Sequence, residues 1–171
     1  VNMLFFAVMI AVILFSITLH EYAHGRAAEA FGDPTPRMSG RMTLNPLAHV
    51  DPIGFLMLIL VRFGWAKPVP INPNYFRDPE KDMAFVALAG PFANFALAVI
   101  LALLFRVVPL PRSEFGYFIL NIFQYAVWIN IALGIFNLLP VPPLDGSRLL
   151  RAVMPYEGRT FLDRLEPYGF F

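Results

Sequence analysis

Long apolar stretches constrain this chain more than any other feature of its sequence. Residues 3–19 carry no charged side chain, and two later stretches, 83–108 and 115–139, are also dominated by apolar residues. A helix needs about 20 such residues to cross a bilayer. The composition agrees, because 58% of the 171 residues are apolar and only 15% are charged, against about 45–50% and about 25% in soluble domains. We therefore expect a mainly α membrane protein with three core transmembrane helices, at 3–31, 83–108 and 115–139.

The region between the first two helices, 37–73, is less regular. Its apolar part, 53–61, is too short to span a membrane and predicts a re-entrant or half-membrane segment. Weak alternation of polar and apolar residues at 37–44, and prolines from 65 to 73, indicate small extended (β) elements, either short strands or extended loops.

The tail, 146–171, begins as an amphipathic sequence and predicts an interfacial helix. No internal repeat is visible, so residues 1–171 are expected to form a single membrane-embedded domain. The chain starts at Val1 and ends at Phe171 in an apolar run, and we expect it to be a processed or truncated form. The first apolar run lacks a basic flank and a cleavage signal, which favours a retained helix over a signal peptide.

Basic residues are distributed unevenly along the chain. Only Arg106 and Arg112 fall near the connection between the second and third long helices, whereas the remaining lysines and arginines precede or follow those two helices. Cytoplasmic loops carry an excess of such residues. The C-terminal ends of the first and third helices are therefore predicted to lie at the same, inner face. No basic run indicates a nucleic-acid partner.

The first apolar helix ends in His20-Glu21-Tyr22-Ala23-His24. This HExxH pattern places two imidazoles one turn apart on one helix face, where both can bind one metal ion, with the glutamate as general base. Ionisable groups at the end of an apolar helix are costly and usually mark function. The alternative is that these residues only cap the helix in the headgroup region. An interface position does not require three ionisable residues at metal-ligand spacing. The chain has no cysteine, so a third ligand has to be His49 or a carboxylate.

Asp145 is the candidate carboxylate. It follows the third long helix, within Asn137-Leu138-Leu139-Pro140-Val141-Pro142-Pro143-Leu144-Asp145-Gly146. The prolines end the helix and could direct the carboxylate inward. Asp145 could equally be the N-cap of the next helix, and the local sequence leaves both readings open.

These paired motifs resemble the site-2 protease family of intramembrane zinc metalloproteases (peptidase family M50), in its compact, prokaryote-like branch. The resemblance covers residues 5 to about 154. It implies one Zn²⁺ held by His20, His24 and Asp145, with Glu21 as general base. It also implies a multi-pass protein of a prokaryotic cell membrane, and the distribution of basic residues given above places the active site near the cytoplasmic face.

Three further residues match parts of the family pattern. By resemblance, Asn137 is a candidate catalytic residue that hydrogen-bonds the oxyanion or positions substrate; a helix-end amide is the alternative. Asn94, after Gly90-Pro91, either lines the active-site cavity or bonds across helices. His49 is expected to be a structural imidazole hydrogen-bonded to Asp51, with gating or transient metal contact as the alternative.

The expected function is hydrolysis of a peptide bond within or near a transmembrane segment of a membrane protein, in the lipid bilayer, as in regulated intramembrane proteolysis. A non-catalytic metal-binding membrane protein or a transporter is the alternative. Transporters often show repeated halves, and this sequence has none. A hydrolase of lipids or small amides is a third reading that zinc chemistry alone does not exclude.

Overall fold

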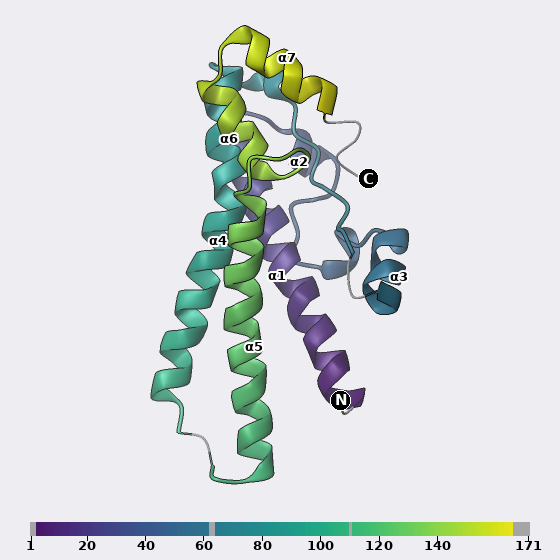
Figure 1. The fold of residues 1–171 in the computed structure, drawn as a ribbon, viewed down its shortest axis with the longest axis vertical. Helices are drawn as coiled ribbons and strands as arrows, with labels where there is room; N and C mark the ends of the chain where they lie inside the picture. The colour runs from purple at the N-terminus through teal and green to yellow at the C-terminus, as the bar shows by residue number, and fades with distance from the viewer. Residues whose placement is uncertain (1–2, 62–63, 110, 166–171) are drawn as a thin grey trace.

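Three long helices form the body of the molecule (Figure 1). The computed structural model describes residues 3–61, 64–109 and 111–165. The helices are α1 (Met3–Ala30), α4 (Pro79–Val107) and α5 (Glu114–Asn137); α4 packs against both of the others, and α1 also contacts α5. All three are long and apolar enough to cross a membrane. The prediction of a mainly helical protein with three candidate spanning helices is confirmed.

The interior of this helix bundle combines buried polar side chains with small apolar ones, and much of its surface is apolar. Ser16, Asn94 and Asn130, one from each long helix, are 0–1% exposed, while Trp128 on α5 is 74% exposed. Hydrogen bonds between helices satisfy the buried groups, and large apolar side chains face outward. This distribution suits a lipid environment, where small and polar residues join helices and apolar residues face the acyl chains.

Two of the helix boundaries differ from the predicted ones because of capping residues. α4 begins at Pro79 instead of 83, since the Asp78 side chain accepts a hydrogen bond from the Lys81 N–H at 3.2 Å and proline fits the first helical position. The helix then continues through Pro91 without ending. α5 begins at Glu114, capped by Ser113, and ends two residues earlier than predicted.

The region between α1 and α4 has non-helical loops at 41–45 and 64–72, as one reading of the sequence predicted, and its described part contains four short helices. They are α2 (Thr35–Met38), η1 (Pro46–Ala48), α3 (Pro52–Val61) and η2 (Pro73–Tyr75). In the described ranges no strand is present, and a single antiparallel bridge pairs Val50 with Ala66. The prolines explain this result, because they lack the N–H that a ladder needs and fit the first turn of a helix. α3, with ten residues, is too short to span, and its re-entrant placement stays a prediction.

The tail forms two helices where one was predicted. α6 (Asp145–Val153) and α7 (Tyr156–Leu165) are separated at Pro155, and residues 166–171 of the predicted tail lie outside the described residues. Both helices lie at the end of the bundle where α5 ends (Figure 1). The Arg151 side chain ties α6 to the start of α4 through Glu80, at 3.2 Å. An interfacial position for these helices stays a prediction.

Candidate metal centre

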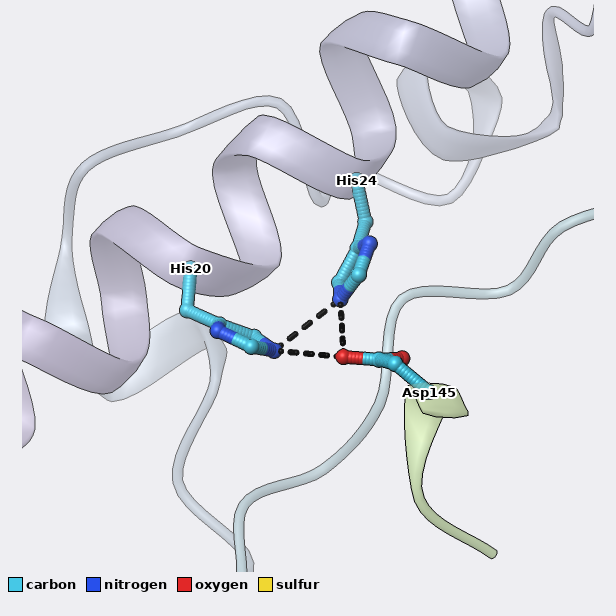
Figure 2. Close-up of side chains that lie close together, drawn as sticks. All are labelled: His20, His24 and Asp145. Atoms are coloured by element: carbon cyan, nitrogen blue, oxygen red, sulfur yellow. Dashed lines mark hydrogen bonds and ion pairs between the residues drawn. The ribbon is translucent and has the colours of Figure 1, made fainter. Parts of the chain in front are cut away.

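Three potential metal ligands converge between α1 and α6. His20 and His24 lie one turn apart on α1 and are both 6% exposed. Their Nε2 atoms are 3.0 Å apart and lie 3.1 and 3.2 Å, respectively, from Asp145 Oδ2 (Figure 2). Within the described ranges these three residues form the one group of histidine, cysteine or carboxylate side chains whose ligand atoms are close enough to share a metal ion.

The chain reaches this position through a turn after α5. Asp145 is the first residue of α6, and Leu144 stands at the N-cap without a side-chain hydrogen bond. Asp145 is therefore not the N-cap, one of the two readings that the local sequence left open. Gly146 is required next to it, because a Cβ there would collide with the carbonyl groups of Leu138 and Leu139.

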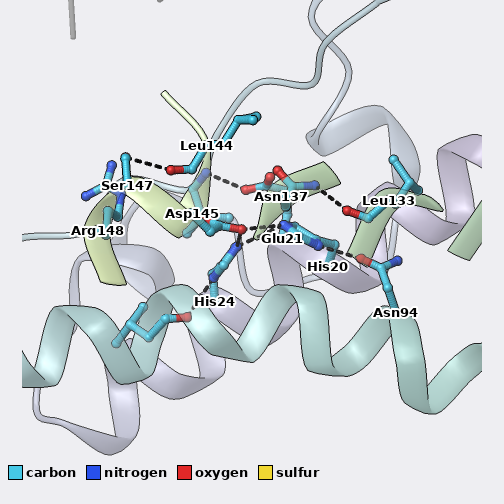
Figure 3. A network of polar contacts seen from close by, with 12 residues as sticks. His20, Glu21, His24, Asn94, Leu133, Asn137, Leu144, Asp145, Ser147 and Arg148 are labelled. Atoms are coloured by element: carbon cyan, nitrogen blue, oxygen red, sulfur yellow. Dashed lines mark hydrogen bonds and ion pairs between the residues drawn. The ribbon is translucent and has the colours of Figure 1, made fainter. Parts of the chain in front are cut away.

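Hydrogen bonds on the far side of each imidazole set its orientation (Figure 3). His20 Nδ1 lies 2.5 Å from the Asn94 Oδ1, and His24 Nδ1 lies 2.8 Å from the Val86 carbonyl oxygen. Because both oxygens only accept hydrogen bonds, each Nδ1 carries the proton and each Nε2 presents a lone pair. This arrangement is the usual way in which a protein prepares histidines for metal binding.

The Asn94 amide is itself held by a buried polar network. Its Nδ2 donates to Asn130 Oδ1 at 2.9 Å and to the Ser16 carbonyl at 3.3 Å, and Asn130 Nδ2 donates to the Ser16 hydroxyl at 2.9 Å. Asn94 thus bonds across helices, which was one of its two predicted readings, and it also contacts His20; it is not among the residues that line the metal cavity. Sequence reasoning did not single out Asn130 or Ser16, although a buried amide inside an apolar helix is a signal that could have found them.

Close packing of α4 against α1 also depends on Gly90. A Cβ at this position would lie 2.6 Å from His20 Nε2 and closer still to His24 Nε2. Any larger side chain would therefore occupy the space beside the ligand nitrogens. Gly90 has a role in the shape of the site in addition to the predicted role in helix packing.

Glu21 faces the same site from α1. Its Oε2 accepts a hydrogen bond from the Val69 N–H at 2.9 Å, which fixes one carboxylate oxygen. Glu21 and Asn137 line a cavity of about 140 Å³ together with the three potential ligands. The Asn137 Nδ2 donates to the Leu133 carbonyl at 3.0 Å, so the helix-end interaction that was one reading of this residue is present.

His49 is not part of this cluster. It is 2% exposed, and its Nε2 lies 3.0 Å from the Thr43 carbonyl oxygen. The expected hydrogen bond to Asp51 is wrong, because the Asp51 carboxylate instead accepts from the Ile53 and Gly54 N–H groups at the start of α3. Short side chains such as aspartate favour bonds to backbone N–H groups two or three residues on.

The electrostatics of the cluster favour a shared cation. Burial raises the pKa of the Asp145 carboxyl, but the contacts from His20 and His24 outweigh it and hold that pKa well below its usual range. Asp145 is therefore a carboxylate. Two nitrogen lone pairs and this carboxylate face one another at 3.0–3.2 Å, and such acceptors repel unless a proton or metal ion lies among them.

A zinc ion fits this donor set. Zinc takes nitrogen and carboxylate ligands at about 2.0–2.2 Å in tetrahedral geometry, and catalytic sites use three protein ligands and keep the fourth position open. Tetrahedral ligand atoms at such bond lengths are roughly 3.3 Å apart, close to the separations given above. Two imidazoles and a carboxylate are also a set that suits zinc.

Sequence comparisons agree with this chemistry. The model of peptidase family M50 matches residues 8–119 and 111–166. YwhC of Bacillus subtilis, assigned as a zinc metalloprotease, is 37% identical over 170 residues, which cover 95% of this chain and 76% of YwhC. Rip2 of Mycolicibacterium smegmatis, with the same assignment, is 32% identical over 171 residues, covering 96% of this chain and 64% of Rip2.

A shorter match adds a third relative. The regulator of sigma-W protease RasP of Bacillus subtilis is 62% identical over 32 residues, which are 19% of this chain and 8% of RasP. No solved structure matches the chain. With its three apolar helices, the chain is an integral membrane protein. It belongs to peptidase family M50 and is a zinc metalloprotease.

Proposed function

We propose that this chain is an intramembrane endopeptidase, which hydrolyses a peptide bond within or near a transmembrane segment of a membrane protein. The observation that carries the proposal is the position of Glu21 in the same buried cavity as the Nε2 atoms of His20 and His24 and the Asp145 carboxylate. These residues come from an apolar helix long enough to span a membrane and from the turn after another. A substrate that reaches them from the bilayer is itself membrane-embedded.

In this proposal His20, His24 and Asp145 hold one zinc ion, and Glu21 is the general base. Zinc would supply Lewis-acid polarisation of the scissile carbonyl and would make a water molecule more acidic. Glu21 takes the proton of the attacking water and delivers it to the leaving amine. The hydrogen bond from the Val69 N–H to Glu21 Oε2 fixes the carboxylate while its other oxygen performs this transfer.

Asn137 and the surrounding walls position the substrate. One hydrogen of the Asn137 amide is used by the Leu133 carbonyl, and the second is available to a carbonyl oxygen of the substrate. A transmembrane substrate has to unwind locally before attack, because its amides are bonded within the helix. Placement of this site near the cytoplasmic face of a prokaryotic membrane is part of the proposal and follows from the distribution of basic residues.

Replacement Glu21→Gln tests the assignment of the base. We expect zinc content to remain at the wild-type level and cleavage of a transmembrane peptide to fall by at least about 10³-fold, because an amide cannot accept the proton. Tyr22→Phe is a matched control on the next position of α1 and should keep activity. Normal cleavage by the Glu21→Gln variant would remove Glu21 as the base.

A further inference from the structure

Three cavities follow one another along the molecule. The metal cavity of about 140 Å³ lies between an apolar cavity of about 410 Å³ and a polar one of about 220 Å³. Phe136 at the end of α5 lines the apolar cavity, Asp145 at the start of α6 lines the metal cavity, and Arg151 further along α6 lines the polar cavity. The connection between α3 and α4 gives the same order, from Ala66 at the apolar cavity to Pro73 at the polar one. The metal ligands therefore lie between an apolar and a polar environment along the chain segments that line them, and the metal and polar cavities share Met83 and Arg148.

Arg148 stands where the metal cavity meets the polar cavity and lines both. It lies on α6 one turn beyond Asp145, on the side away from His20 (Figure 3). Across the described ranges its guanidinium makes one polar side-chain contact, at 3.5 Å to the Met83 Sδ, and a thioether is a weak acceptor. Arg151, one turn further on, is instead paired with Glu80 at 3.2 Å.

The other donors around the metal cavity are largely engaged. The Val69 N–H is bonded to Glu21, and the Asn137 amide donates to a helix carbonyl. Pro68 and Pro143, which also line the cavity, have no N–H to offer. Arg148 is thus the side chain on this wall that has a permanent positive charge and uncommitted donors.

We propose that Arg148 binds an acidic side chain of the substrate, located on the side of the scissile bond that lies in the polar cavity. This inference rests on the proposed proteolytic function and adds a sequence preference to it. A guanidinium presents a planar fork that matches a carboxylate. The polar cavity also has a positive balance, since Arg148 and Arg151 face the single carboxylate of Glu80 among its lining residues.

The preferred substrate is then an apolar segment followed within a few residues by aspartate or glutamate. The apolar part fits the larger cavity, which is lined by side chains such as Ile17, Leu58 and Phe136. The acidic residue reaches Arg148 just beyond the metal ligands. A substrate with lysine at this place would put two cations against each other.

Three synthetic transmembrane peptides test this preference on the zinc-loaded protein in detergent. They are identical except for glutamate, glutamine or lysine at one position within five residues of the scissile bond, and each position is tried in turn. At one of these positions we expect the kcat/KM of wild type to be about tenfold higher for the glutamate peptide than for the glutamine peptide. The kcat/KM for the lysine peptide should be lower than that for the glutamine peptide. Arg148→Met should abolish this discrimination, and Arg148→Glu should reverse it toward lysine.

Arg151→Met is the matched control, because it removes a cation from the same cavity but not from the wall of the metal cavity. It should keep the preference for glutamate. Equal cleavage of the three peptides by wild type at every position, or unchanged discrimination in Arg148→Met, would overturn the role of Arg148 while leaving the protease assignment intact. Failure of wild type to cleave any peptide would instead count against the proposed function.

Discussion

Replacement of Asn94 by alanine isolates the contribution of the residue that orients His20. The substitution removes the Oδ1 that lies 2.5 Å from His20 Nδ1, and the imidazole then loses both its fixed rotation and its preferred tautomer. Mutation of a residue that hydrogen-bonds a metal-binding histidine typically lowers metal affinity by 10–100-fold. We therefore expect zinc to bind Asn94→Ala about 10–100-fold more weakly, a loss of about 1.4–2.8 kcal/mol at about 1.4 kcal/mol per tenfold.

The same substitution also affects stability, because Asn94 is 0% exposed and its Nδ2 donates to Asn130 Oδ1. A buried group left without its partner costs about 1–3 kcal/mol. The two effects are separated by a second variant, Asn130→Ala, which disturbs the network but leaves the contact between Asn94 and His20. It should destabilise the protein to a similar degree and weaken zinc binding much less.

Zinc affinity is measured by competition with a chromophoric chelator, and stability by unfolding of the metal-free protein in mixed micelles. The reasoning would be refuted if Asn94→Ala bound zinc as tightly as wild type. It would also be refuted if Asn130→Ala weakened zinc binding as much as Asn94→Ala does, because the loss would then reflect general disruption of the bundle.

Three further outcomes are expected. Gly90→Ala should reduce zinc content per chain strongly, since its Cβ would lie 2.6 Å from His20 Nε2; Ala87→Gly on the same helix is the control. Asp145→Asn should lose zinc, whereas His49→Ala should keep it, because His49 lies outside the ligand cluster. The zinc content of each purified variant tests this expectation, and the reverse pattern would overturn the ligand set. Treatment with a chelator should abolish cleavage, and added zinc should restore it within the same sample; activity that survives complete metal removal would contradict the proposed chemistry.

Much of the helical framework could be predicted from the sequence, because hydropathy and short-range spacing act within single segments. The apolar runs predict α1, α4 and α5, and the HExxH spacing places His20 and His24 on one face of α1 by helix geometry alone. The boundaries were less accurate, since a capping residue such as Asp78 extends a helix beyond its apolar part. Strands between α1 and α4 are not confirmed, whereas residues 64–72 form a non-helical loop with one bridge, because weak alternation in a proline-rich segment does not distinguish loops and short helical turns from strands.

The sequence by itself determined the candidate spanning helices, the paired histidines and the candidate base, and it offered Asp145 as a possible third ligand, which the family resemblance then favoured. Tertiary packing alone decided the contacts that complete the site. His20 meets Asn94 across 74 residues and Asp145 across 125, and Val69 reaches Glu21 from a separate segment. Such contacts depend on how helices pack and where a turn directs the chain. Local periodicity carries no information about those distances, and for that reason the orienting network and the cavity beside Arg148 emerged only from the folded structure.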